Sequence, residues 1–113
     1  MSERPVNIII EDILDAVNAV ADYTSGKDYE TFANDRMCRD AVLRNIEVIG
    51  EAINKLPNDF LDKHPQVEWH KPRGMRNRLA HGYFAVDFLI VWETATTVLP
   101  EFKIQIEQLQ KEF

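Results

Sequence analysis

The stretch "AVLRNIEVIGEAINKL", Ala41–Leu56, carries apolar residues at steps of three and four positions. Because an α-helix takes 3.6 residues per turn, this spacing places the apolar side chains along one face. Asn34 or Asp35 can cap such a helix at its start, and Pro57 would end it. The inner face that we predict consists of Met37, Ala41, Val42, Ile46, Ile49, Ile53 and Leu56. The stretch therefore predicts a long amphipathic helix with one buried face.

The same spacing predicts a long helix on either side of this stretch. Near the start of the chain, Pro5 suits a first helical turn, and "TSGK", 24–27, interrupts the pattern. The apolar face of this first helix would be Val6, Ile9, Ile10, Ile13, Val17 and Val20. Near the end of the chain, Asp87 is the predicted N-cap of the last helix and Pro100 is its predicted kink. The apolar face of the last helix would be Leu89, Trp92, Ala95, Leu99, Phe102, Ile106, Leu109 and Phe113.

The segment "PNDFLDKHPQVEWHKP", 57–72, contains three prolines and can support only short helical turns. After it, residues 73–81 predict a helix of about two to three turns that Gly82 would end. No stretch alternates with the period of a β-strand. Four helices with short links predict an all-α fold, an antiparallel up-and-down bundle of four to five helices that forms a single domain over residues 1–113.

Composition and cysteine content indicate the compartment. The chain is 45% hydrophobic and 28% charged, which is typical of a globular protein and excludes a disordered one. Cys38 is the one cysteine, so no intramolecular disulfide can form, and no signal-peptide pattern precedes the first helix. The apolar runs fall far short of the roughly 20 residues that cross a bilayer. We therefore expect a cytoplasmic protein that does not enter a membrane.

Positive charge is concentrated in one part of an acidic chain. The net charge is −6, yet residues 63–83 hold five basic residues and one acidic residue, a local +4 that leaves −10 elsewhere. The acidic net charge argues against a broad basic face that binds nucleic acid, and the local positive charge is focused on one segment. It fits either a basic turn that balances an acidic body or a small site for an anion, and charge alone does not decide between them.

The stretch "MRNRLAHGYF", 75–84, combines groups that suit a phosphodiester. His81 can exchange a proton near neutral pH. In a helix, Arg73, Asn77 and His81 would share one stripe, with Arg76 and Tyr83 on a neighbouring one if the helix continued. Arginine offers a planar charged fork for phosphate oxygens, and Arg73, Arg78 and Asn77 could support phosphate or ribose contacts. The alternative is a helix end whose dipole favours cations, with no chemistry.

Other kinds of site find less support in the sequence. The spacing of His64, His70 and His81 does not match common zinc patterns, so we expect no metal and no cofactor. Walker and GxGxxG motifs are absent, and no serine or cysteine has the signature of a nucleophile. Trp69 and Trp92 are predicted to be core anchors rather than platforms for stacked bases.

A family resemblance rests on the string "RNRLAHGY", 76–83, which has arginine, four residues, histidine, any residue and tyrosine. The string resembles the motif of the HepT-like toxins of the HEPN superfamily, which are small all-helical ribonucleases. The stretches "AVLRNIEVIGEAINKL", "VEWHKPRGM" and "YFAVDFLIVWETATTVLPEF" also resemble that family. Nearly the whole chain is covered.

The resemblance implies roles for the motif residues and for partners. Arg76 and His81 would be catalytic, and Asn77 would be the adjacent polar residue. The domain would work as a homodimer and would be the toxin of a type VII-like toxin–antitoxin system. Its antitoxin would be a minimal (MNT-type) nucleotidyltransferase that attaches AMP to Tyr83 and so silences the toxin.

The implied reaction agrees with the chemistry of RNA. Cleavage without a metal uses the ribose 2′-hydroxyl as nucleophile and needs one group to remove its proton and another to protonate the leaving oxygen. One His81 cannot easily do both at once, whereas a two-fold dimer supplies two copies. The substrate would be a single-stranded region of RNA, such as a tRNA or an mRNA. Two alternatives remain: a non-catalytic helical subunit that binds a nucleotide or a nucleotidyltransferase, and a plain dimerisation module.

Overall fold

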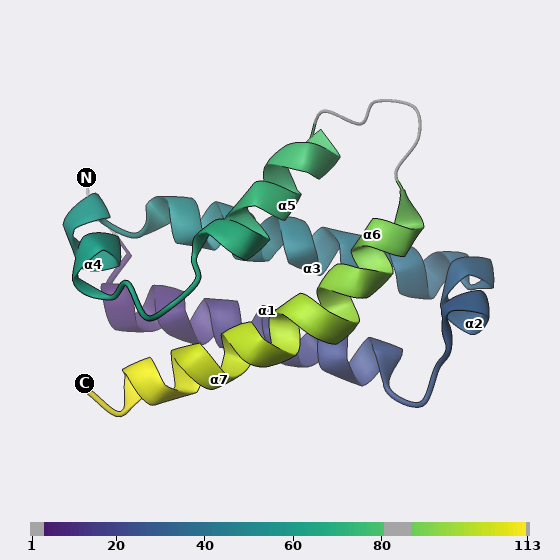
Figure 1. Ribbon diagram of the computed structural model, residues 1–113, viewed down its shortest axis with the longest axis horizontal. Helices are drawn as coiled ribbons and strands as arrows, with labels where there is room; N and C mark the ends of the chain where they lie inside the picture. The colour runs from purple at the N-terminus through teal and green to yellow at the C-terminus, as the bar shows by residue number, and fades with distance from the viewer. Residues whose placement is uncertain (1–3, 81–86, 113) are drawn as a thin grey trace.

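The computed structural model describes residues 4–80 and 87–112, with side chains for 4–75 and 87–112. Within these ranges every regular element is helical, which confirms the predicted all-α class (Figure 1). The elements are α1 (Val6–Thr24), α2 (Tyr29–Asn34), α3 (Arg36–Lys55), α4 (Asn58–Lys63), α5 (His70–Ala80), α6 (Phe88–Glu93), the π-helical turn η1 (Thr94–Val98) and α7 (Leu99–Gln110).

Three long helical segments lie alongside one another, and α1 runs opposite to the other two (Figure 1). Figure 1 shows α1 and α3 antiparallel, with α6, η1 and α7 forming one bent rod that returns along α1. Helix α5 crosses α3 at an angle, and its C-terminal end points away from the bundle. The described residues therefore form the predicted up-and-down bundle, with the short helices α2 and α4 at its two ends.

The core between α1 and α3 follows the predicted faces, with one error of register. Met37 is 85% exposed, whereas Cys38 is 8% exposed and faces inward. Cys38 lies four residues before Val42 and hence on the same stripe, while Met37 points about 140° away from Val42. The predicted buried residues that are confirmed are Ile9, Ile10, Ile13, Val17, Val20, Val42, Ile46, Ile49, Ile53 and Leu56.

The last rod contains the predicted disturbance near Pro100. The amide of Leu99 donates to the carbonyl of Thr94, which closes a π turn directly before Pro100. A proline lacks the N–H that an α-helix needs, and its ring crowds the carbonyl four residues earlier. The wider turn inserts one residue into the helix and rotates the preceding segment. As a result Val91 is fully buried and Leu89 is 46% exposed, so the predicted burial of Leu89 is wrong.

The rest of the last apolar face agrees with the prediction. Trp92 is half-buried, and Phe113 lies outside the described residues. Ala95, Leu99, Phe102, Ile106 and Leu109 are buried. Asp87 caps α6 as predicted, because its Oδ1 accepts hydrogen bonds from the amides of Leu89 (3.0 Å) and Ile90 (3.4 Å).

Helix α2 was not predicted from the sequence. Asp28 caps it by accepting a hydrogen bond of 2.8 Å from the amide of Thr31, and its one buried residue is Phe32. The ring of Phe32 lies 5.1 Å from that of Trp92 and 6.4 Å from that of Phe88, measured between centroids. Trp92 is thus an anchor that joins α6 to α2, as expected of a core residue.

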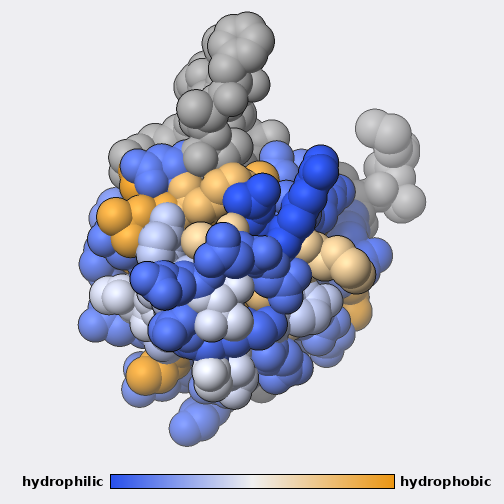
Figure 2. All heavy atoms as spheres, turned by 90° about the vertical axis from the view of Figure 1, so that its right-hand side faces the viewer, coloured by the Kyte–Doolittle hydropathy of each residue, from blue (hydrophilic) through white to orange (hydrophobic). Residues whose placement is uncertain are grey.

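The surface at the α2 end of the bundle is mostly hydrophilic, with some hydrophobic atoms exposed in the upper half of the view (Figure 2). Met37 at the start of α3 and Leu89 on α6 are large apolar side chains that solvent reaches. No described helix is both long and apolar enough to span a membrane.

Candidate active site

Helix α5 carries the first half of the motif. The sequence predicted a helix from residue 73, and the structure starts it earlier, at His70. Pro72 can lie in a first turn, because the amides there need no partner inside the helix. The backbone of Arg76, Asn77 and Arg78 is helical, and the helix reaches Ala80. Arg73 and Asn77 therefore share one stripe of α5.

The second half of the motif is outside the described residues. The structure describes neither His81 nor Tyr83. Of Arg76, Asn77 and Arg78 it describes the backbone but not the side chains. Their grouping around one phosphate stays a prediction. Figure 1 shows that the two flanks of this segment, the end of α5 and the start of α6, rise on the same side of the bundle.

Trp69 anchors the start of α5, as predicted. The residue is 7% exposed, and its indole N–H donates a hydrogen bond of 3.1 Å to the carbonyl of His64. Its ring meets that of Phe102 on α7 edge-on at 6.0 Å and that of Phe60 on α4 at 6.2 Å. Burial of an aromatic ring with a satisfied N–H stabilises this junction.

A polar contact also joins α7 to Glu68, two residues before α5 begins. The amide of Glu68 donates to Oε1 of Gln105 (2.8 Å), and Nε2 of Gln105 donates to Oε1 of Glu68 (2.9 Å). Lys71 forms an ion pair of 2.9 Å with the same carboxylate. The hydrogen bond from Lys71, followed by that from Gln105, lowers the pKa of Glu68. Sequence reasoning missed Gln105, because a pair 37 residues apart leaves no local signal.

Arg39 fixes the other flank of the motif. Its guanidinium lies 4.7 Å above the centre of the Phe88 ring, at the start of α6, and Nη1 donates to the carbonyl of Ala33 (3.1 Å). A cation over an aromatic face is attracted to it. The helix that follows the motif is thus tied to α2 and α3, a role for Arg39 that the sequence did not reveal.

Arg73 is the predicted site residue whose side chain the structure describes. It is half-buried, and its Nε is buried without a hydrogen-bond partner among the described residues. It lines a hollow between α4 and α5, here called the α4–α5 hollow. The hollow is lined by Asn58, Leu61, Asp62, Pro65, Val67, Trp69, His70 and Arg73. This arrangement leaves a cation available for an anion beside the motif helix.

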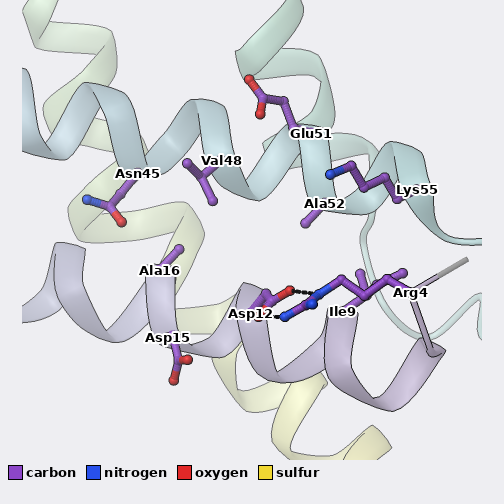
Figure 3. Close-up of a pocket in the computed structure, with 10 residues that line it drawn as sticks. All are labelled: Arg4, Ile9, Asp12, Asp15, Ala16, Asn45, Val48, Glu51, Ala52 and Lys55. Carbon is purple, nitrogen blue, oxygen red and sulfur yellow. Dashed lines mark hydrogen bonds and ion pairs between the residues drawn. The ribbon is translucent and has the colours of Figure 1, made fainter.

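A second hollow lies between α1 and α3 and involves no residue of α5 (Figure 3). Arg4 turns onto Asp12 there, with hydrogen bonds of 2.6 Å and 3.0 Å that lower the pKa of the Asp12 carboxyl. The positive charge of Arg4 is thus paired with the negative charge of Asp12. In residues 4–80 and 87–112 no cluster of three or more histidine, cysteine or acidic side chains is arranged to hold a metal.

Comparisons with known proteins agree with the residue pattern. The chain matches the model of the HepT-like ribonuclease family over residues 13–109. A Methanocaldococcus jannaschii protein, named as an inferred RNase, is 40% identical over 99% of this chain and 97% of its own length. A Thermococcus cleftensis protein, named as an inferred ribonuclease HepT, is 37% identical over 90% of this chain and 93% of its own. No solved structure matches the chain significantly.

Proposed function

Because the chain belongs to the HepT-like ribonuclease family, we propose that it is a metal-independent endoribonuclease in which Arg76 and His81 carry the chemistry. The observation that supports this most is the family match over residues 13–109, which includes the whole string from Arg76 to Tyr83. The first part of that string, from Arg76 to Ala80, lies on helix α5, and a site on a helix is held more precisely than a site on a loop.

The proposed reaction is attack of a ribose 2′-hydroxyl on the adjacent phosphorus. One His81 removes the hydroxyl proton as the bond from O2′ to phosphorus forms. The bond from phosphorus to O5′ then breaks, and a second histidine gives a proton to that oxygen. The products are a 2′,3′-cyclic phosphate and a free 5′-hydroxyl. Arg76 binds the non-bridging oxygens, whose charge increases in the transition state.

The second histidine is proposed to come from a homodimer. A two-fold axis beside α5 would place two copies of the motif across one cleft. Leu89 on α6 and Met37 on α3 are exposed apolar side chains that such an interface could cover. The single-stranded RNA substrate, a tRNA or an mRNA, would lie in this cleft.

Regulation is proposed to act on Tyr83. An MNT-type nucleotidyltransferase antitoxin would attach AMP to its hydroxyl, and the system would be a type VII-like toxin–antitoxin pair in the cytoplasm. The added phosphate would repel RNA and compete for Arg76. Incubation with the partner and ATP should add the mass of one adenylate to the wild type and none to Tyr83→Phe. Equal masses for the two proteins would contradict this role.

Cleavage of RNA tests the central proposal. Wild type and His81→Ala would be incubated with end-labelled single-stranded RNA and with a tRNA pool, both in EDTA. We expect cleavage by the wild type alone, with 2′,3′-cyclic phosphate ends. Equal traces from both proteins would indicate a contaminant, and an intact substrate would favour a non-catalytic partner subunit.

A further inference from the structure

The α4–α5 hollow has two polar rims and an apolar wall. On α4 and just beyond it, Asn58, Leu61, Asp62 and Pro65 are spaced at three and four residues and so face one side. On α5, His70 and Arg73 are three residues apart and face the hollow from the other side. The wall includes Leu61, Val67 and Trp69, which are all buried. The apolar wall and the polar rims suit a ring with polar edges and an attached anion.

Arg73 supplies the charge for that anion. Its Nε is buried without an acceptor, and the guanidinium forms no ion pair with any other described residue. A phosphate in the hollow cannot reach the enclosed Nε, but Arg73 lines the hollow and brings its positive charge there. Guanidinium and phosphate match in geometry and in charge.

The position of Arg73 relates the hollow to the motif. Arg73 lies one helical turn before Asn77, a distance of about 6 Å along α5, and on the same stripe. The spacing between bases in a stacked strand is about 3.4 Å, so a strand that runs along α5 from Asn77 toward Arg73 would reach the hollow within one or two nucleotides.

We propose that the α4–α5 hollow binds one nucleotide of the RNA, next to the phosphate that is cut. Arg73 binds the phosphate of this nucleotide, and the base enters the hollow with its edge toward Asp62 and Asn58. The inference rests on the proposed ribonuclease function, because it assigns a subsite to the same substrate.

Asp62 sets the base preference of the subsite. A carboxylate accepts a hydrogen bond from the exocyclic amine of cytosine, whereas uracil presents a carbonyl oxygen at that position. Two acceptors facing each other repel. Cytosine should therefore be bound more tightly than uracil, which differs from it at this edge of the ring.

The two tryptophans give a test on the unmodified protein. Trp69 lines the hollow, and Trp92 packs against Phe32 at the other end of the bundle (Figure 1). The ¹⁵N-labelled wild type would be titrated with cytidine 3′,5′-bisphosphate and, separately, with the uridine compound. We expect the indole resonance of Trp69 to shift while that of Trp92 stays, with the uridine compound at least about fivefold weaker. A shift of both resonances, or of neither, would overturn the subsite.

Variants then separate the subsite from the cleavage reaction. Arg73→Gln should weaken binding of the cytidine compound about tenfold. The matched control Lys63→Gln removes the same charge from α4 outside the hollow and should change binding less than twofold. Asp62→Asn should abolish the preference for cytosine. Equal binding by Arg73→Gln and the wild type would overturn the proposal.

The experiments give different results when the proposed nucleotide subsite is wrong and when the proposed ribonuclease function is wrong. If the wild type cuts RNA while Arg73→Gln binds the bisphosphate normally, the function holds and the subsite is overturned. If the wild type cuts no RNA but Trp69 shifts and Arg73→Gln binds weakly, the nucleotide site holds and the ribonuclease proposal fails. If there is neither cleavage nor a shift of Trp69, both are overturned.

Discussion

Single side chains hold both flanks of the segment that carries the motif. Trp69 anchors the first turn of α5 through its buried ring and its hydrogen bond to His64. Asp87 and Arg39 fix the start of α6 by capping its amides and by covering the ring of Phe88. A reaction that needs groups placed to within a fraction of an ångström gains from supports of this kind.

The N-cap at Asp87 is expected to contribute more to the free energy of unfolding than an exposed ion pair does. Asp87→Ala leaves the first amides of α6 without a partner and should reduce the free energy of unfolding by about 1 kcal/mol. Asp40→Ala is the matched control, because Asp40 forms an exposed pair with Arg36 at 3.7 Å and should cost less than about 0.5 kcal/mol. Urea unfolding measures both changes. Equal losses would mean that the cap does not stabilise α6.

Glu68 should make stability depend on pH. Its pKa is lowered in the folded state by the hydrogen bonds from Lys71 and Gln105. Such a carboxyl group stabilises the fold above its unfolded pKa, roughly 4.3, and this contribution is lost as the pH falls through the folded pKa. The difference in urea midpoint between the wild type and Glu68→Gln should therefore be larger at about pH 7 than at about pH 3. A difference that is the same at both would contradict this account.

At the scale of the element, the π turn η1 decides which side chains of α6 are buried. The one inserted residue turns Val91 to the interior and leaves Leu89 in solvent. Val91→Ala should cost about 2 kcal/mol of unfolding free energy through lost burial and the cavity that remains. Leu89→Ala removes a larger side chain but should cost about 0.5 kcal/mol when unfolding is measured on the monomer, where the proposed dimer interface does not cover Leu89. A larger loss for Leu89→Ala than for Val91→Ala under that condition would mean that α6 follows the regular α-helical register.

The elements that the sequence predicted are those whose signal is local. The faces of α1 and α3 follow from residues within a few turns of one another, and the caps Asp35 and Asp87 immediately precede their helices. The misplaced residues, Met37 and Leu89, lie at helix starts, where a stripe is short or where a π turn later in the same rod shifts it. Helix α2 has six residues, too few for a periodic pattern.

At the scale of the whole molecule, the candidate site combines local and distant contributions. The motif string identified α5, and the charge count indicated the basic segment. The sequence could not show that Gln105 holds Glu68, or that Asn58 and Asp62 line the same hollow as Arg73, because these residues come together only in the folded chain. Residues far apart in the chain leave no periodic signal, so they were found in the structure.

The proposed dimer makes a quantitative prediction for mixed assemblies. If both histidines of a pair act on one phosphate, a dimer of wild type and His81→Ala is inactive. Equal amounts of the two chains, unfolded together and refolded, should then retain about one quarter of the RNA cleavage of the same total amount of wild type, since one dimer in four is intact by random pairing. Tagged and untagged wild type, treated alike, should retain full cleavage. A mixture that keeps about one half would mean that each protomer cuts alone, and the second catalytic group would then have to come from the same chain.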